Sequence, residues 1–113
     1  MHKFATRENW STLAGMPDQP LTSAEIASAL PSLPGWTHER EALTKEFKFG
    51  SFREALSFMV RVGFEAEAMD HHPDWTNVYN RVAIRLQTHD AGGKVTVKDV
   101  ALAHKIQGLS WVG

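Results

Sequence analysis

The sequence predicts an α+β domain in which helices cover one face of a four-stranded antiparallel sheet. Helix-start signals occur at three places, and two pairs of strand-like segments lie between them, giving the order α-β-β-α-β-β-α. Hairpins that alternate with helices pack as a sheet with its helices on one side. The 113 residues are enough for one such domain.

Each predicted helix starts at a hydroxyl residue that is followed three positions later by a carboxylate. In this arrangement the hydroxyl accepts from one unpaired backbone N–H and the carboxylate accepts from another. We expect helices over residues 23–30, from 52 toward 71, and over 97–107. Pro31 ends the first and Gly108 ends the third. The pairs that mark the starts are Thr22 and Glu25, Ser51 and Glu54, and Thr96 and Asp99.

The predicted strands show an alternation of apolar and polar residues. Leu43, Lys45, Phe47 and Phe49 share one parity, and Thr44, Glu46 and Lys48 share the other. Later in the chain, β-branched and aromatic residues are concentrated in two adjacent segments. The first hairpin is expected to join residues 36–40 to 43–49, and the second to join 75–80 to 82–88.

Composition excludes several classes of protein. The 12 basic and 13 acidic residues leave no excess positive charge for a nucleic-acid backbone. The absence of cysteine excludes disulfides, thiolate metal sites and a cysteine nucleophile, and it fits a cytoplasmic location. No apolar run is long enough to span a membrane, and the first residues lack the apolar segment of a secretory signal. Residues 1–20 have no clear period and are expected to form a loosely packed extension before a domain over 21–113.

The middle helix provides the first chemical clue. Phe52, Leu56, Met59 and Gly63 fall on one face of a helical wheel, with Ala55 and Ala66 beside them, and we expect this apolar face to be buried. Glu67 falls on the same face, so its carboxylate needs a partner. His71 lies four residues further on, and we expect the two to pair. The following His72 and Pro73 then turn the chain out of the helix.

Three interpretations of the histidines remain open. Histidines at the end of a helix can be structural, because they interact favourably with the helix dipole. A metal site is less favoured, because the adjacent His71 and His72 point in different directions and no HExxH pattern is present. The third interpretation is acid–base catalysis, since the second predicted hairpin would return His89 to the neighbourhood of His72. Trp75 beside them can be a core residue or the wall of a pocket.

From Phe47 to Ile106 the sequence resembles the pterin-4a-carbinolamine dehydratase family. The resemblance rests on FKFGSFREALSFMVRVGFEAEAMDHHPDW, NVYNRVAIRLQTHD and TVKDVALAHKI, and HHPDW followed by NVYN and TH is a specific combination. It implies the same α+β fold, a homodimer or homotetramer, and no cofactor. The implied activity is dehydration of 4a-hydroxytetrahydropterin to the quinonoid dihydropterin, which recycles the pterin used by aromatic amino-acid hydroxylases. Some members also assist dimerisation of a homeodomain transcription factor.

The resemblance also implies roles for individual residues. It places the catalytic histidines at His71, His72 and His89. Our hypothesis is that His72 and His89 face the reacting atoms while His71, paired with Glu67, orients the pterin. Asp99 matches an acidic family position, but its helix-capping role explains it equally well, and we do not assign it to catalysis. The substrate-binding residues that the resemblance implies are Glu67, Asp70, Trp75, Thr88 and Asp90.

Two departures from the family pattern stand out. Ala68 occupies a position that is usually basic, and ten positions separate His89 from Asp99 where nine are more common. The longer spacing affects the expected placement of Lys98 and Asp99.

The alternative to an enzyme is a non-catalytic dimeric module that binds a partner protein. Such a module has no need for three histidines around one hollow.

Overall fold

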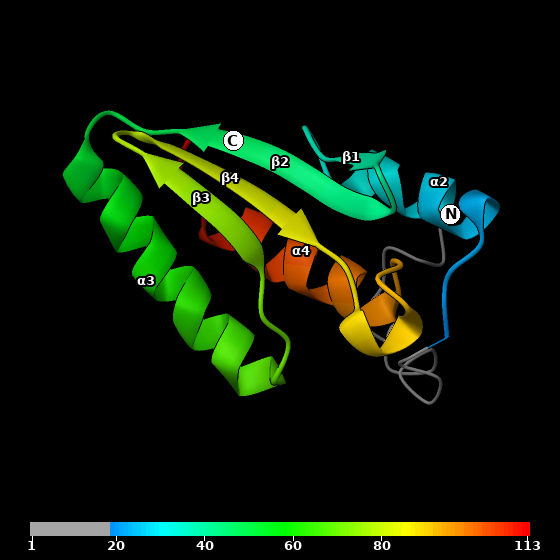
Figure 1. Ribbon diagram of the computed structural model, residues 1–113. Coiled ribbons are helices and arrows are strands. Elements are labelled where there is room, and N and C mark those ends of the chain that lie inside the picture. Colours follow the sequence, from blue (N-terminus) through cyan, green and yellow to red (C-terminus); the bar gives the residue numbers. More distant parts are fainter. Residues whose placement is uncertain (1–18) are drawn as a thin grey trace.

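The structure is a computed structural model that describes residues 19–113 (Figure 1). The predicted extension over residues 1–20 lies almost entirely outside the described residues. Three α-helices and four strands follow in the predicted order, with two short 3-10 helices. In chain order they are α2 (Ser23–Ala29), η2 (Leu30–Ser32), β1 (Thr37–Glu39), β2 (Ala42–Lys48), α3 (Phe52–Met69), β3 (Asp74–Val78), β4 (Arg81–Leu86), η3 (His89–Ala91) and α4 (Val97–Leu109).

The four strands form one antiparallel sheet in the order β1-β2-β4-β3, which confirms the predicted fold class (Figure 1). Both expected hairpins are present, β1 with β2 and β3 with β4, and β2 pairs with β4 across the centre. The β3–β4 hairpin pairs Val78 with Arg81 at its tip and Asp74 with Arg85 at its open end. The residues before Asp74 and those after Leu86 therefore leave the sheet close to each other.

One face of the sheet packs on α3 and α4, and together they enclose the core. The core includes Phe47 and Ile84 from the sheet, Phe58 and Val62 from α3, and Ile106 from α4. Thr76 and Thr44 lie on the other face of the sheet, which no described helix covers. The molecule thus has two layers, as expected for hairpins that alternate with helices.

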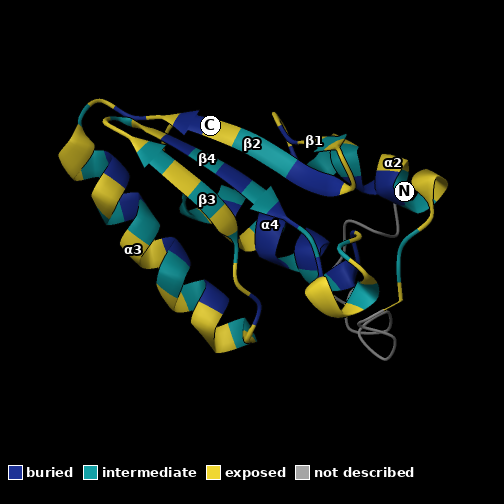
Figure 2. Cartoon of the chain, viewed as in Figure 1, coloured by how far each residue is buried: buried dark blue, intermediate teal, exposed yellow. Residues whose placement is uncertain are grey.

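The predicted buried face of α3 was right only in part, because Ala55 and Ala66 are buried but other members of the face are exposed. Phe52 and Leu56 are each 47% exposed, whereas the buried residues of this helix are Ala55, Phe58, Val62 and Ala66. Figure 2 shows exposed and buried bands alternating along α3. The helix has apolar residues on two faces, so periodicity alone could not say which one faces the sheet. The second apolar stripe, Phe52, Leu56, Val60 and Phe64, is left at the surface.

The helix starts agree with the prediction, but two helix ends do not. Thr22 with Glu25 and Thr96 with Asp99 form capping boxes, and the Ser51 hydroxyl accepts from the backbone of Glu54. The third helix continues through Gly108 to Leu109, so Gly108 is not its stop. The middle helix ends at Met69, two residues before the predicted end. None of the described helices is long and apolar enough to cross a membrane.

Candidate active site

The end of α3 separates two neighbouring histidines. Asp70 caps the helix in the left-handed conformation, with φ 52° and ψ 42°. The N–H of Asp70 then donates to Glu67 O and the N–H of His71 donates to Ala66 O. These two bonds form a Schellman-type helix end, which turns the chain sharply. His71 and His72 therefore leave the helix in different directions.

His71 turns inward to a buried carboxylate. Its Nε2 lies 2.5 Å from Asp99 Oδ1, and Asp99 is fully buried at the start of α4. The other Asp99 oxygen accepts from the Thr88 hydroxyl at 2.8 Å and from the Thr96 N–H at 2.8 Å. A carboxylate can only accept hydrogen bonds. The proton in the hydrogen bond between His71 and Asp99 therefore belongs to Nε2 of His71. The opposite ring nitrogen of a neutral His71 is therefore a proton acceptor.

Thr88 extends this buried network. Its hydroxyl lies 2.7 Å from the Thr96 hydroxyl as well as 2.8 Å from Asp99. Because Thr88 has one hydroxyl proton and donates it to Asp99, Thr96 must be the donor to Thr88. Thr88, Thr96 and Asp99 are all buried, and each hydrogen-bonds within the network. The network joins the end of β4 to the start of α4 and holds His71 against both.

His72 turns outward, and this corrects the predicted Glu67–His71 pair. Glu67 Oε1 lies 2.9 Å from His72 Nε2, and the two side chains are 80% and 58% exposed. The prediction assumed that the helix continued through His71, which would place Glu67 and His71 on the same helix face. The left-handed Asp70 ends the helix before His71, so the two side chains do not face each other. Glu67 therefore lies at the surface, outside the apolar core.

His89 lies beyond the end of β4, whereas the predicted strand over residues 82–88 would have placed it directly at the strand end. The strand stops at Leu86, and His89 opens the one-turn helix η3. An isolated antiparallel bridge between Thr88 and Lys94 closes the loop, with Thr88 N–H donating to Lys94 O at 2.9 Å. Gly92 and Gly93 have φ of 74° and 77°, a region that favours glycine. These two glycines allow the loop to absorb the longer spacing, and Asp99 still reaches His71 and Thr88.

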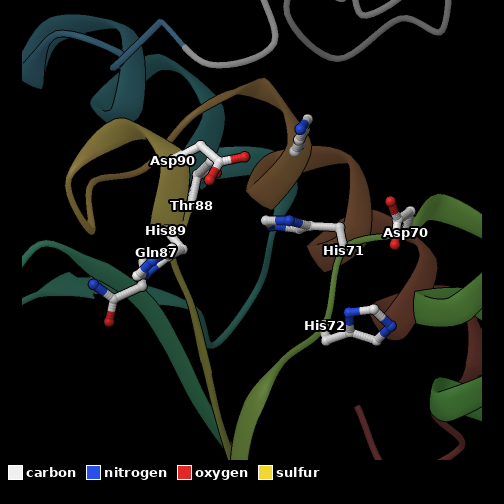
Figure 3. Close-up of a pocket in the computed structure, with 8 residues that line it drawn as sticks. Asp70, His71, His72, Gln87, Thr88, His89 and Asp90 are labelled. Atoms are coloured by element: carbon white, nitrogen blue, oxygen red, sulfur yellow. The ribbon is translucent and has the colours of Figure 1, made fainter.

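One pocket of about 250 Å³ lies between these segments (Figure 3). It brings together six of the eight predicted site residues from the end of α3 and from the loop after β4. Figure 3 shows His71 facing the segment that carries Thr88 and Asp90, while His72 lies to one side. The six are Asp70, His71, His72, Thr88, His89 and Asp90.

Glu67 and Trp75 do not line this pocket. Glu67 is adjacent to it through its hydrogen bond to His72. The side chain of Trp75 is half-buried and packs against the hydrophobic core. Within the residues described, Trp75 is therefore part of the core packing. Its role as an aromatic wall for the pterin stays a prediction.

The pocket also contains two residues that sequence reasoning missed, Gln87 and Lys98. The continued alternation after β4 could have indicated Gln87, because it shares the parity of Arg85 rather than that of buried Leu86. Asp99 matched an acidic family position, but its capping role explained it equally well and it was not assigned to the site. Its hydrogen bond to His71 joins residues 28 positions apart, and no local pattern reports such a contact.

The described residues contain no group of three or more His, Cys, Asp or Glu side chains that could hold a metal ion. His71 and His72 each have a carboxylate partner, and the two partners lie in different environments. Separate imidazoles therefore line a small polar pocket, and the imidazole of His71 is held in place by the buried carboxylate of Asp99. Such groups can donate and accept protons near neutral pH.

The fold and site define a class: a two-layer α+β protein with a histidine-lined polar pocket at the open end of a hairpin. The chain belongs to the pterin 4 alpha carbinolamine dehydratase family, whose model matches residues 19–109. It is 63% identical over 93 residues to a protein of Opitutus terrae, covering 82% of this chain and 96% of the relative. It is 49% identical over 94 residues to a protein of Rhizorhabdus wittichii, covering 81% and 96%. Both relatives carry the provisional name pterin-4-alpha-carbinolamine dehydratase.

A solved structure has the same architecture. The crystal structure of a protein from Brucella melitensis, described as a transcriptional coactivator/pterin dehydratase, matches with a TM-score of 0.78 and 40% sequence identity. The match covers 84% of this chain and all of that one. These relatives support a dehydratase of the pterin family.

Proposed function

We propose that the protein dehydrates 4a-hydroxytetrahydropterin to the quinonoid dihydropterin by histidine acid–base catalysis. The observation that carries the proposal is the grouping of His71, His72 and His89 around one pocket. Loss of water requires a proton on the departing C4a hydroxyl and removal of the proton on N5. Two imidazoles in opposite protonation states can perform both transfers, and neither becomes covalently attached to the substrate.

The proposed division of roles keeps His72 and His89 at the reacting atoms. One of them protonates the hydroxyl as the C4a–O bond breaks, and the other accepts the proton from N5. His71 orients the pterin, with its direction set by the buried Asp99 rather than by Glu67. Asp70, Asp90 and Thr88 line the same hollow and supply polar contacts for the pterin ring. No metal or cofactor takes part in this scheme.

The test is turnover of freshly generated 4a-hydroxytetrahydropterin. We expect wild type to accelerate the reaction above the spontaneous rate, and His72→Ala and His89→Ala each to lose roughly 10²–10⁴-fold of that acceleration. His38→Ala is the matched control, because His38 lies on β1 away from the pocket. Prolonged dialysis against a chelator should leave turnover unchanged. A His89→Ala variant with full activity would contradict the assignment, and activity lost to the chelator would contradict metal independence.

We also propose that the protein self-associates through α3, as a homodimer or homotetramer. Phe52, Leu56, Val60 and Phe64 form a continuous exposed apolar stripe along this helix, and Phe64 is 72% exposed. Apolar stripes of this kind on small proteins are typical of protein interfaces. Phe64→Glu should lower the mass measured by light scattering, whereas Thr76→Glu on the open sheet face should not. An unchanged mass for Phe64→Glu would contradict this interface.

The stripe also favours a second candidate function, a module that binds a partner protein. The Brucella melitensis relative is described as a coactivator as well as a dehydratase. Turnover separates the two candidates, because a folded wild-type protein without acceleration supports the module. The proposed enzyme would recycle the pterin used by an aromatic amino-acid hydroxylase. We also propose a cytoplasmic location, because the cysteine-free sequence suits a reducing compartment.

A further inference from the structure

The backbone pairing of the sheet does not reach the histidines. The last pair in the β3–β4 hairpin joins Asp74 to Arg85. His71 and His72 precede this pair on one strand, and His89 follows it on the other. The spacing between the two histidine-bearing segments must therefore be set by side chains. The buried Asp99 provides one such link, because it binds both His71 and Thr88.

A second set of contacts lies on the opposite side of β4. Arg85 Nη2 donates to Gln87 Oε1 at 3.0 Å, and Gln87 Nε2 donates to Gly93 O at 2.6 Å. Arg85 Nε also lies 3.9 Å from Asp74 Oδ2 at the start of β3. Arg85 and Gln87 alternate with the buried Leu86 and so lie on the other face from it. The contacts run from the first residue of β3 to the far end of the loop that carries His89.

The Gln87 amide is held in a single orientation. The guanidinium is a donor only, which requires the amide oxygen on that side, and the Gly93 carbonyl is an acceptor only, which requires the amide nitrogen. A Cβ on Gly93 would lie 2.8 Å from Gln87 Nε2, so glycine allows the close approach. Gln87 is half-buried at the edge of the pocket, and in Figure 3 its amide points away from His71.

We propose that Gln87, anchored by Arg85, is a positioning residue that holds the 88–93 loop and thereby the imidazole of His89. This inference rests on the proposed function, in which His89 transfers a proton. Gln87 acts through the loop, because its amide is used by Arg85 and Gly93 and is directed away from the histidine opposite. It complements Asp99, which fixes the same loop from the buried side through Thr88.

The first test separates positioning from substrate binding. In Gln87→Met, which keeps the length of the side chain and removes both hydrogen bonds, we expect kcat to fall about tenfold or more with KM changed less than twofold. Small displacements of a reacting group have effects of this size. Arg81→Met is the matched control, since Arg81 lies on the same strand and face but outside the pocket. A raised KM with unchanged kcat, or unchanged kcat and KM, would overturn the proposal.

A double-mutant cycle tests whether Arg85 acts through Gln87. Arg85→Met should lower kcat less than Gln87→Met does, and the double variant should match Gln87→Met alone, because the Arg85 contact has no route to the loop without the amide. Effects that multiply would overturn the link. Gln87→Glu is a further variant that can still accept from Arg85 but cannot donate to Gly93. It should resemble Gln87→Met, and its recovery of wild-type kcat would count against the Gly93 bond.

A magnetic-resonance measurement does not depend on turnover. We expect the ring signals of His89 and the amide signals of Gly92 and Gly93 to shift or broaden in Gln87→Met, while those of His72 stay in place. The amide of Gly93, which donates to Thr88 O, should also exchange faster with solvent. If wild type shows no dehydratase activity, the proposed function fails and this measurement still decides the role of Gln87. Unchanged His89 and loop signals in a folded variant would overturn it; if Gln87→Met does not fold, Arg85→Met takes its place in the measurement.

Discussion

His71 and His72 are neighbours in sequence, and each is hydrogen-bonded to a carboxylate, but the two pairs lie in opposite environments. The His71–Asp99 side chains are 9% and 0% exposed, whereas those of His72 and Glu67 are 58% and 80% exposed. A buried pair is screened little by water, and breaking it leaves an unpaired polar group in the interior. An exposed pair is screened and contributes little. The same kind of pair, an imidazole with a carboxylate, thus gives one buried and one exposed histidine.

The difference originates in the backbone of one residue. Asp70 in the left-handed conformation ends α3 and sends consecutive side chains to opposite sides. His71 meets a carboxylate from α4, and His72 turns back to a carboxylate on the last turn of α3. The pocket therefore combines a buried imidazole held by the interior with an exposed imidazole held only at the surface. The predictions below test that contrast by removing parts of each pair.

The largest effect is expected from Asp99. Asp99→Ala removes the acceptor for His71, Thr88 and the Thr96 N–H together, and it should lower the free energy of unfolding by about 3 kcal/mol. Urea denaturation measures this loss, and we expect the unfolding free energy to depend on urea concentration with the same slope in both proteins. In Asp99→Asn we expect a smaller loss of stability, but a kcat lower by roughly 10²-fold or more. The amide would donate to His71 Nε2 and so reverse the tautomer of the ring.

Two outcomes for Asp99 would contradict the contrast. Asp99→Asn with wild-type turnover would show that the direction of the His71 proton is unimportant. Asp99→Ala with a loss of stability no larger than that of an exposed pair would show that the buried network contributes little. Since Asp99 also caps α4, Lys98→Ala at the preceding position is the control for general changes at the helix start in the denaturation measurement; Lys98 lines the pocket, so it is not a control for turnover.

The architecture could be predicted because its signals are local. Capping residues at Thr22, Ser51 and Thr96 and the alternation along β2 and β4 depend on neighbours within a few positions, and the structure confirms the elements that they predicted. The buried face of α3 was predicted only in part, because the helix is apolar on two sides and only the packed sheet decides between them. The sequence pattern also predicted a helix that continues beyond Asp70, because an aspartate is not an expected left-handed cap.

The grouping of the site was partly predictable for the same reason. Hairpin geometry alone predicts that His89 lies near His72, although the strand ends three residues before His89. The partner of each histidine was not predictable, because the His71–Asp99 contact joins two helices through the interior. Gln87 was missed as well, since its role depends on a loop with two left-handed glycines that sequence spacing does not describe.

The next largest effect is expected from Thr88, at the centre of the buried network. Thr88→Val keeps the shape of the side chain but removes the hydroxyl that joins Thr96 to Asp99. We expect a loss of roughly 1–2 kcal/mol in the free energy of unfolding, because two buried partners lose a hydrogen bond. Thr76→Val makes the same change at an exposed position on β3 and should be nearly neutral. Equal losses for the two variants would contradict a special role for the buried hydroxyl.

A small effect is expected from the exposed pair. Glu67→Gln should change the free energy of unfolding by about 0.5 kcal/mol or less, because its carboxylate and His72 are both well solvated. Any change in turnover should diminish as salt is added, since screening weakens the same contact in wild type. Denaturation and turnover at low and high salt provide the measurement. A loss as large as that of Asp99→Ala would remove the distinction between the two histidines.

His104 tests the effect of partial burial on a histidine and should give the smallest effect. Burial lowers the pKa of His104 below its usual 6.5, because water no longer stabilises the charged ring. The unfolded chain therefore binds this proton at higher pH than the folded one, so the contribution of His104 to stability is present above 6.5 and is lost as the pH falls below it. Urea midpoints at pH 7.5 and 5.5 should fall further for wild type than for His104→Gln. A midpoint difference that is the same in both proteins, or larger in the variant, would show that half-burial beside Ser32 leaves the ring as free to take a proton as it is in the unfolded chain.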